Sequence, residues 1–442
     1  MNNIKRDDNL IFGGCDTVEL AKEYKTPLYV ISEKIIRDRC TEIKDDFLNK
    51  YKNVTAVYAS KAFLTLTMCK IIESEGLGLD VVSGGELFTA IKANFPLNKV
   101  IFHGNNKTVE ELNMAIEYEV GRIVVDNLYE LELIRKIAKR LNKKVKILYR
   151  ITPGVKSDTH EYITTGQKDS KFGIPLNEEI ISEAVKKGMK YEEIDLLGFH
   201  LHVGSQLFDN SSHLAGVEVA LRLIKKANDE YDFVTKELNT GGGFGIYYSG
   251  DDVRKPLNYF TDSIMDLIND RCKSQGLKIP KVIIEPGRWI IGEAGITLYT
   301  IGSIKQIPNI RTYVAVDGGM TDNPRPALYG AKYNAVIANK VNKKKNKVVT
   351  IAGKCCESGD ILIKDIALPK VESGDILAVS STGAYNHSMA NNYNKNTRPA
   401  VVLVNDGESE LIVRRETYKD LLIREKLPSR FQDTEVNERR SV

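Results

Sequence analysis

Eight short apolar runs, rich in β-branched residues, recur along the first two thirds of the chain. They begin at Thr55, Gly76, Lys99, Arg122, Lys144, Leu196, Glu237 and Lys281. The segments between them, such as residues 127–142, carry apolar side chains at helical spacing. Alternating strands and helices predict a parallel sheet, and eight such units favour a closed (β/α)8 TIM-like barrel over a doubly wound sheet.

The pattern changes after about residue 290, where strand-like runs follow one another between Gly, Asn, Asp and Pro turns. The runs are TYVAVD, KVVTIAG, DILIKD, DILAVSS, AVVLVND and ELIVRRE. They predict an all-β second domain. The early run TPLYVIS, from Thr26, precedes the barrel and is a candidate to pair with that domain. We therefore expect residues 1–40 to contribute to the β-domain, 41–290 to form the barrel and 291–442 to form the C-terminal β-domain.

The charge pattern and the cysteines exclude several classes of protein. The 63 basic and 59 acidic residues are dispersed, with a net charge of +4, which is too balanced for a nucleic-acid-binding field. The first residues lack the apolar region of a secretory signal, and no later apolar run reaches the ~20 residues of a membrane span. The six cysteines show no C-x-x-C spacing, so we expect free thiols in a cytoplasmic protein.

Polar residues gather at the C-terminal ends of the predicted barrel strands, where the loops of such a barrel form one mouth. They are Lys61, Asp80, Ser83, His103, Asn105, Asp126, Arg150, His200, His202, Gly204, Ser205, Gly241 to Gly243, Glu285 and Arg288. Lys61 ends an otherwise apolar strand, where a partly desolvated amine is a candidate Schiff-base former. A rim lysine that extends to water is the alternative.

Two further motifs each allow a functional and a structural interpretation. Gly241, Gly242 and Gly243 follow a strand directly and leave backbone N–H groups free to surround a phosphate, although a tight turn explains them equally well. His200 and His202 are two residues apart and share one face of a strand. A metal pair lacks an obvious third ligand, so we favour an imidazole against a cofactor ring, or a hydrogen-bonded core histidine, and expect no metal.

EPGR places a carboxylate, Glu285, and a guanidinium, Arg288, at the end of the last barrel strand. The two are candidates for a simple structural ion pair. Alternatively, Glu285 holds a pyridinium nitrogen protonated while Arg288 binds a carboxylate or phosphate through two hydrogen bonds.

Together these motifs resemble the fold-type III, pyridoxal-phosphate-dependent amino-acid decarboxylases, which have an alanine racemase-like fold, and among them the branch that acts on diaminopimelate. The resemblance covers nearly the whole chain, in the order YASKAF, GLGLDVVSGGEL, HGNNK, RITPGV, THEYITTG, SKFGI, GFHLHVGSQ, NTGGGFGI, EPGR, RPALYGA, CCESGD and GAYNHSMANNYN. Lys354, Cys355, Asn386 and His387 depart from the family pattern. The resemblance implies pyridoxal 5'-phosphate as cofactor and decarboxylation of meso-2,6-diaminopimelate to L-lysine, the last step of lysine biosynthesis.

The resemblance also implies residue roles. Lys61 would carry the cofactor, His202 would stack on its ring and Glu285 would pair with its pyridine nitrogen. The other implied cofactor-binding residues are Asp80, Ser205, Gly241, Gly242, Gly243, Gly287, Arg288 and Tyr385. The implied substrate-binding residues are Arg288, Arg325, Tyr329, Glu357 and Tyr385. Cys356 would act as the general acid and, with Glu357, would enter the site of the neighbouring subunit of a homodimer.

Other functions remain open at this point. A related decarboxylase acting on ornithine, arginine or carboxynorspermidine would share the fold, and a noncatalytic pyridoxal-phosphate-binding protein would share the barrel. A racemase is disfavoured by Glu285, because a racemase benefits from a weaker electron sink. Diaminopimelate is preferred because it carries an amino acid group at each end, and Arg325, Tyr329 and Glu357 would provide the second recognition point. A zinc-dependent barrel hydrolase is the least favoured alternative.

Overall fold

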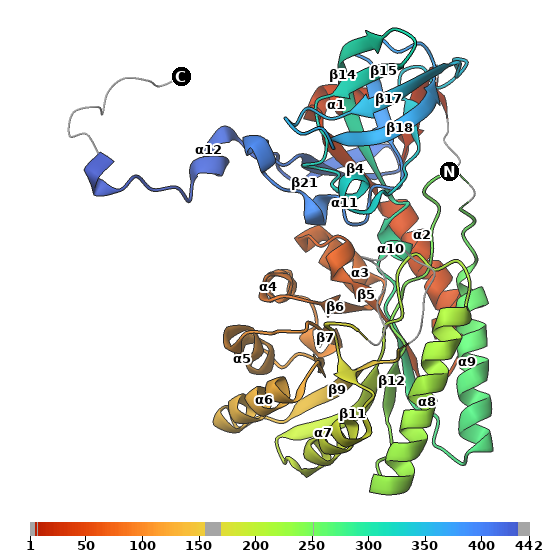
Figure 1. The fold of residues 1–442 in the computed structure, drawn as a ribbon, viewed down its shortest axis with the longest axis vertical. Coiled ribbons are helices and arrows are strands. Elements are labelled where there is room, and N and C mark those ends of the chain that lie inside the picture. The colour runs from red at the N-terminus through yellow and green to blue at the C-terminus, as the bar shows by residue number, and fades with distance from the viewer. Residues whose placement is uncertain (1–4, 7, 155–168, 251, 432–442) are drawn as a thin grey trace.

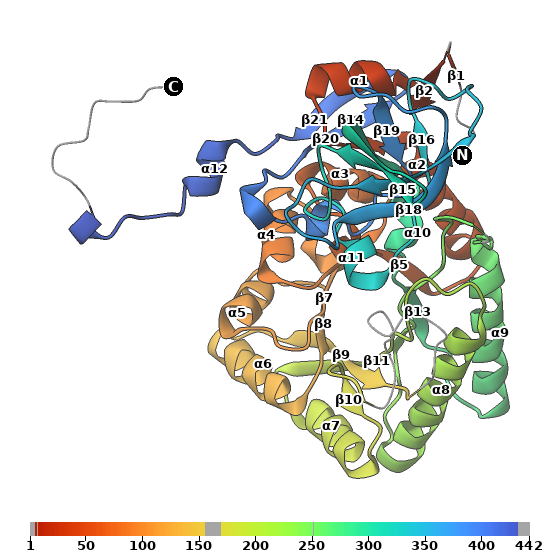
Figure 2. The same ribbon diagram turned by 45° about the horizontal axis from the view of Figure 1, so that its top comes forward.

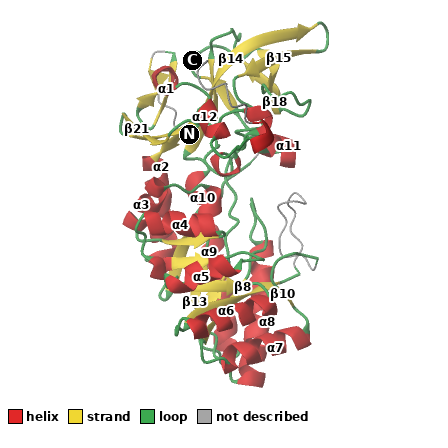
Figure 3. Cartoon of the chain, turned by 90° about the vertical axis from the view of Figure 1, so that its left-hand side faces the viewer, coloured by secondary structure: helices red, strands yellow, loops and turns green. Residues whose placement is uncertain are grey.

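The computed structural model describes residues 5–6, 8–154, 169–250 and 252–431. A barrel of strands ringed by helices occupies the lower half of Figure 1, and a β-rich domain lies above it. Figure 3 shows the same division, with strands gathered in two separate regions. The motif THEYITTG lies within 155–168 and therefore outside the described residues.

Eight parallel strands close into the barrel, because β8 pairs with β7 on one side and with β9 on the other. In chain order they are β5 (Val54–Ala59), β6 (Gly78–Val81), β7 (Val100–Phe102), β8 (Arg122–Val125), β9 (Val145–Thr152), β11 (Ile194–His200), β12 (Glu237–Asn239) and β13 (Lys281–Ile284). A two-residue strand, β10 (Ile174–Pro175), pairs with the end of β9. The predicted (β/α)8 barrel is confirmed.

Helices surround the barrel on its outside (Figure 2). They are α2 (Glu33–Ile43), α3 (Leu66–Ser74), α4 (Gly84–Lys92), α5 (Val109–Glu117), α6 (Leu128–Arg140), α7 (Glu178–Lys190), α8 (Ser211–Tyr231), α9 (Leu257–Ser274) and the short α10 (Arg288–Ile291). Several begin at a polar side chain that accepts a backbone N–H of the first turn, as Thr65, Ser83, Thr108 and Asn127 do for α3 to α6. The ends of these βα loops are thereby held close to the mouth of the barrel.

A separate cluster of six buried apolar residues draws one side chain from each of six barrel strands. Its members are Val57, Ile101, Val124, Leu148, Leu197 and Ile283. Because neighbouring residues on the same strands pack in the main core, this cluster fills the interior of the barrel. The interior of the barrel is therefore a packed core at this layer.

The second domain contains a sheet of nine strands. They are β4 (Leu28–Ser32), β14 (Gly295–Ile307), β15 (Arg311–Val316), β16 (Ala335–Ile337), β17 (Lys347–Ala352), β18 (Ile361–Leu368), β19 (Ile376–Val379), β20 (Ala400–Asn405) and β21 (Glu408–Val413). The early strand β4 lies between β14 and β20. The strand-like runs predicted from the sequence did not include β14. Its second half, residues 302–306, is exposed and contains Gly and Lys rather than a continuous apolar stretch.

Smaller elements complete the chain. A three-stranded sheet, β1 (Lys5–Arg6), β2 (Asn9–Phe12) and β3 (Cys15–Asp16), precedes α1 (Thr17–Tyr24). The helix α11 (Arg325–Tyr329) belongs to the second domain, and α12 (Tyr418–Leu422) lies on a C-terminal arm that projects away from it (Figure 1). Among the described helices, none combines the length and the apolar character that crossing a membrane requires.

Candidate active site

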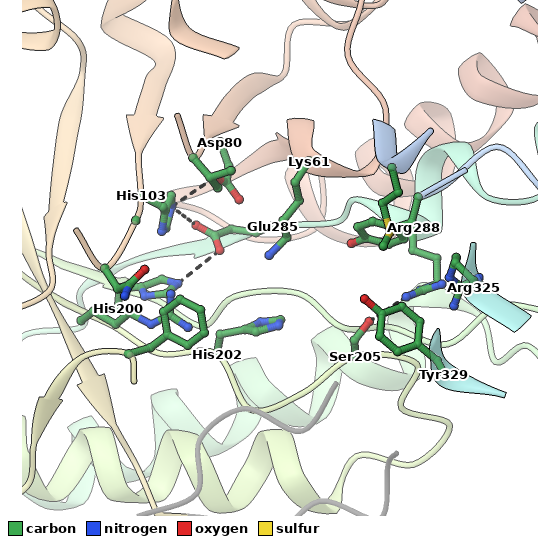
Figure 4. A pocket seen from close by; sticks show the side chains of 17 residues that line it. Lys61, Asp80, His103, His200, His202, Ser205, Glu285, Arg288, Arg325 and Tyr329 are labelled. Atoms are coloured by element: carbon green, nitrogen blue, oxygen red, sulfur yellow. Dashed lines mark hydrogen bonds and ion pairs between the residues drawn. The ribbon is translucent and has the colours of Figure 1, made fainter. Parts of the chain in front are cut away.

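A cavity of about 390 Å³ lies at the C-terminal ends of the barrel strands, and the β-domain closes part of it (Figure 4). Its lining is Lys61, Asp80, Val82, His103, Gly104, Asn105, Arg150, Phe172, His200, His202, Ser205, Glu285, Arg288, Arg325, Tyr329, Tyr385 and Met389. Arg325, Tyr329, Tyr385 and Met389 come from the second domain. Two domains therefore build one site.

The polar floor of the cavity follows from the two-residue period of the strands. Ile101, Leu148 and Ile283 point into the barrel core, so the residues two positions later point the same way, one layer higher. These residues are His103, Arg150 and Glu285, and all three line the cavity. Apolar side chains fill the barrel, and the layer at its mouth is ionisable.

Glu285 is the centre of this polar layer. Its Oε1 lies 2.8 Å from His103 Nε2, and its Oε2 lies 3.2 Å from His200 Nε2 (Figure 4). The Asn239 side-chain amide also donates to Oε1, at 2.6 Å. Burial raises the pKa of Glu285, but the interactions with His103 and His200 outweigh it and hold the pKa well below its usual value. A buried, charged carboxylate results.

The two sequence-predicted histidines occupy different positions. Burial lowers the pKa of His200 to about 4, so its imidazole is neutral. Burial and the nearby cations Lys61 and Arg150 lower the pKa of His202 well below its usual value. The backbone N–H of Gly242 donates to His202 Nδ1 at 3.5 Å, which holds the ring beside the glycine run.

A small side cavity of about 60 Å³ opens beside the main one. Ser205, Gly243, Gly287, Arg288 and Tyr385 are among its lining residues. Their hydroxyl groups, guanidinium and glycine backbone form a donor set that suits a small anion such as a phosphate group.

The glycine run is also required by packing. A Cβ on Gly242 would lie 2.1 Å from the carbonyl oxygen of Glu285, and one on Gly243 would lie 2.2 Å from that of Gly204. Gly243 has a φ of +100°, a region that favours glycine. The run is therefore a tight structural turn as well as part of the side-cavity wall.

Two guanidinium groups form the side of the cavity away from the histidines. Arg288 donates to the Tyr248 hydroxyl, and to the Ser205 hydroxyl at 3.1 Å. Arg325 donates to the Tyr333 hydroxyl at 2.6 Å. Burial raises the pKa of Tyr248, but the two cations outweigh it and lower the pKa. Aromatic hydroxyl groups thus fix both guanidiniums against the cavity.

Lys61 lies in a short 3-10 turn, Ser60–Ala62, that follows β5. Its side chain points into the space bounded by Glu285, His202 and Arg288 (Figure 4). Asp80, at the end of β6, is buried in the same layer, 3.7 Å from His103. The Lys61 amine therefore faces both the ionisable layer around Glu285 and the side of the cavity formed by Arg288 and Arg325.

Cys356 and Glu357 are not among the residues that line this cavity. Both are exposed in the β-domain, where the backbone N–H of Cys356 donates to the Asn394 side chain at 2.9 Å. The other proposed site residues line one of the two cavities or, like Gly241 and Gly242, lie directly behind His202 and Glu285.

Sequence reasoning assigned no role to four residues that organise the site. Asn239 links Glu285 to the glycine run, since its Oδ1 accepts the Gly241 N–H at 2.9 Å. His213 Nε2 lies 3.0 Å from the carbonyl oxygen of Gly242, and Tyr248 and Tyr333 orient the arginines. For Asn239, the local signal was its position directly before Thr240 and the glycine run. His213, Tyr248 and Tyr333 do not stand at the predicted strand ends, so the sequence pattern did not mark them.

The ligand atoms of His103, His200 and Glu285 lie within 4.8 Å of one another, a geometry in which a metal ion could bind. The grouping differs from the His200 and His202 pair that the sequence raised. In the structure, both oxygens of Glu285 already face imidazole nitrogens at hydrogen-bonding distance.

Comparison with known proteins gives consistent matches. Residues 34–292 match the family model described as "Pyridoxal-dependent decarboxylase, pyridoxal binding domain". The chain is 50% identical to diaminopimelate decarboxylase of Bacillus subtilis strain 168 over 414 residues, which is 94% of each chain, and 49% identical to that of Bacillus methanolicus over 93% of this chain and 96% of the relative. The crystal structure of the M. jannaschii enzyme in co-complex with L-lysine superposes with a TM-score of 0.91 at 36% identity, covering 98% and 99% of the two chains.

Proposed function

This chain belongs to the diaminopimelate decarboxylases, a family of pyridoxal-dependent decarboxylases, and from that premise we propose how its own residues bind the cofactor and the substrate. The protein is an enzyme that uses pyridoxal 5'-phosphate and converts meso-2,6-diaminopimelate to L-lysine and carbon dioxide. The residue roles are supported by one observation: the same cavity is lined by Lys61, Glu285, Arg288 and Arg325.

The residues fit the cofactor. Lys61 offers an amine inside the main cavity, and the side cavity offers hydroxyl, guanidinium and backbone donors from Ser205, Arg288 and the glycines. Glu285 offers a charged carboxylate in the floor of the cavity, and His202 offers a neutral, flat ring beside Lys61. We propose that Lys61 carries the cofactor, that the side cavity holds its phosphate and that His202 packs on its ring.

When bound, pyridoxal phosphate supplies a conjugated ring that accepts the electrons left as carbon dioxide departs. Glu285 would strengthen that property by keeping the ring nitrogen protonated. Lys61 and His202 orient the reacting end of the substrate in a cavity that is partly closed by the β-domain. Cys356 of the partner subunit would donate a proton to the α-carbon of the substrate, and general-acid help of this kind contributes about 100- to 10,000-fold.

The distal end of the substrate is recognised on the arginine side of the cavity. Arg325 and Arg288 bind its carboxylate, and Tyr329 and Tyr385 line the approach. Glu357 of the partner subunit binds the distal ammonium group. A diamine without the distal carboxylate would leave buried guanidinium donors unpaired, which disfavours it.

The exposed position of Cys356 and Glu357 supports a homodimer in which each subunit completes the site of the other. We also propose a cytoplasmic location, and we keep the division into residues 1–40, 41–290 and 291–442 as a proposal.

The test of this function is lysine formation by purified protein reconstituted with pyridoxal phosphate. Meso-diaminopimelate, ornithine and arginine are supplied in parallel, and lysine is expected from meso-diaminopimelate alone. Turnover of ornithine or arginine in place of meso-diaminopimelate would contradict the substrate-binding roles proposed for Arg325, Tyr329 and Glu357. If none of the three substrates were converted to product, the catalytic assignment would be contradicted.

A further inference from the structure

We propose that His103 and His200 are positioning residues for Glu285: His200 donates to one of its carboxylate oxygens, His103 contacts the other, and together they keep the carboxylate charged and in one orientation. The inference rests on the proposed role of Glu285 toward the ring nitrogen of the cofactor. Neither histidine needs to touch the substrate for this role.

The geometry gives each carboxylate oxygen its own imidazole. His103 Nε2 lies 2.8 Å from Oε1, and His200 Nε2 lies 3.2 Å from Oε2. The three side chains come from the ends of three strands, β7, β11 and β13, and each is at most 6% exposed. The two imidazoles also meet edge to face, with centroids 4.7 Å apart at 71°. The carboxylate is therefore held from two directions by side chains that restrain each other.

The hydrogen-bonding pattern assigns the proton of His200. In the part of the chain that the structure describes, His200 Nδ1 is buried and has no hydrogen-bond partner. Because the ring is neutral, it has a single N–H, and only on Nε2 does that N–H meet an acceptor, the Oε2 of Glu285. His200 thus acts as a fixed donor rather than as an acid or base.

His103 Nε2 faces two buried carboxylates, 2.8 Å from Glu285 Oε1 and 3.7 Å from Asp80 Oδ1. Burial raises the pKa of Asp80 to about 6, and the nearby Glu285 also raises it, while His103 lowers it. One nitrogen, His103 Nε2, thus faces both carboxylates and offsets part of the repulsion between the two acids. Removal of His103 would leave two acids in one buried layer without this interaction, and like charges in such a site raise the pKa of one of them.

Other charged and polar groups also face Glu285 and must be counted in any pH profile. They are Lys61 after β5, Asp80 after β6, Arg150 on β9 and Asn239 on β12. The Asn239 amide remains as a donor to Oε1 in all four histidine variants.

The test compares His200→Leu with His200→Gln, and His103→Leu with His103→Gln, in cofactor-loaded enzyme. Gln places an amide N–H near the position of Nε2, whereas Leu removes the donor and keeps the bulk. For each Leu variant we expect bound cofactor, a kcat lowered about 10- to 100-fold, as the loss of a polar interaction with a charged group implies, and little change in KM. The Gln variants should recover most of the loss.

A second readout follows the protonation of Glu285 without turnover. The absorption spectrum of the bound cofactor is titrated with pH in the absence of substrate. Because a lost donor raises the pKa of Glu285, the acid-side spectral transition should move to higher pH in the Leu variants and return in the Gln variants. His387→Leu is the matched control, since His387 is partly buried and packs edge-on against Phe63 and Tyr29, and it should leave this transition in place.

A double-mutant cycle with Glu285→Gln separates positioning from general structure. If the histidines act through Glu285, His200→Leu should have little further effect on kcat in the Glu285→Gln background. An undiminished effect in that background would overturn the inference, as would Leu variants with wild-type kcat and spectra, or Gln variants as impaired as Leu. Full activity of Glu285→Gln alone is a different result, and it would remove the proposed role of Glu285 itself.

Discussion

Replacing Arg325 by Lys tests the proposed recognition of the distal carboxylate. Arg325 is buried, donates to Tyr333 at 2.6 Å and lies with its guanidinium carbon 5.1 Å from the centre of the Tyr248 ring. These contacts fix the plane of the guanidinium and leave its other donors for a ligand. Lys keeps the positive charge but lacks the planar fork that binds a carboxylate through two hydrogen bonds.

The size of the effect follows from that difference. We expect the substrate to lose one charge-assisted hydrogen bond, which contributes about 1.5–3 kcal/mol. The KM for meso-diaminopimelate should therefore rise about 10- to 150-fold. The kcat should change little, because the reacting end of the substrate lies at Lys61, on the other side of the cavity.

The assay is steady-state lysine formation over a range of meso-diaminopimelate concentrations. Arg222→Lys, an exposed exchange on α8 that keeps the charge, is the matched control and should leave KM unchanged. Thermal unfolding of both variants checks that the fold is intact. An unchanged KM in the Arg325→Lys enzyme, or a loss confined to kcat, would refute the assignment of Arg325 to the distal carboxylate.

Three further results are expected. Lys61→Ala should abolish the absorption band of cofactor bonded to the protein, and retention of that band would refute its role. Cys356→Ala should keep the cofactor but lose most turnover. If the two subunits of a dimer share their active sites, mixing this variant with Lys61→Ala protein should restore about a quarter of wild-type activity. No recovery of activity in the mixture would count against shared sites. Burial raises the pKa of Asp322 to about 7, above its value of ~3.9 in an unfolded chain, so its contribution to stability falls as the pH rises between these values. Asp322→Asn should reduce the difference in unfolding free energy between pH 5 and pH 8, as measured by denaturant unfolding. An equal difference in wild type and variant would contradict the argument.

The eight barrel strands could be predicted because each is a short run of β-branched residues followed by a helix with a regular apolar face. The position of the candidate site followed from the same pattern, since residues at the strand ends of such a barrel meet at one mouth. Lys61, His202 and Glu285 were expected at that mouth, and all three line the cavity. The strand β14 was missed because half of it is exposed and carries polar residues, so its pairing with β4, β15 and β19 is visible only in the folded sheet.

The partners of the site residues could not be predicted from local pattern. His103 and Glu285 are far apart in the chain, and nothing near either residue indicates that they lie 2.8 Å apart. Tyr248 and Tyr333 likewise hold the two arginines from loops outside the predicted strand ends. Such contacts depend on strand order and register, which place distant segments side by side.

The sequence by itself determined the barrel, the β-rich second domain and the residue types available at the mouth, because strand and helix periodicity are local properties of the chain. Only the tertiary structure decided how these residues act on one another: which imidazole faces each oxygen of Glu285, which hydroxyl group orients each arginine, and that Cys356 lies outside the cavity of its own chain. The physical reason is that hydrogen bonds and charge interactions depend on distances of a few ångströms between side chains. The tertiary fold sets those distances, as closure of the barrel does for His103, His200 and Glu285.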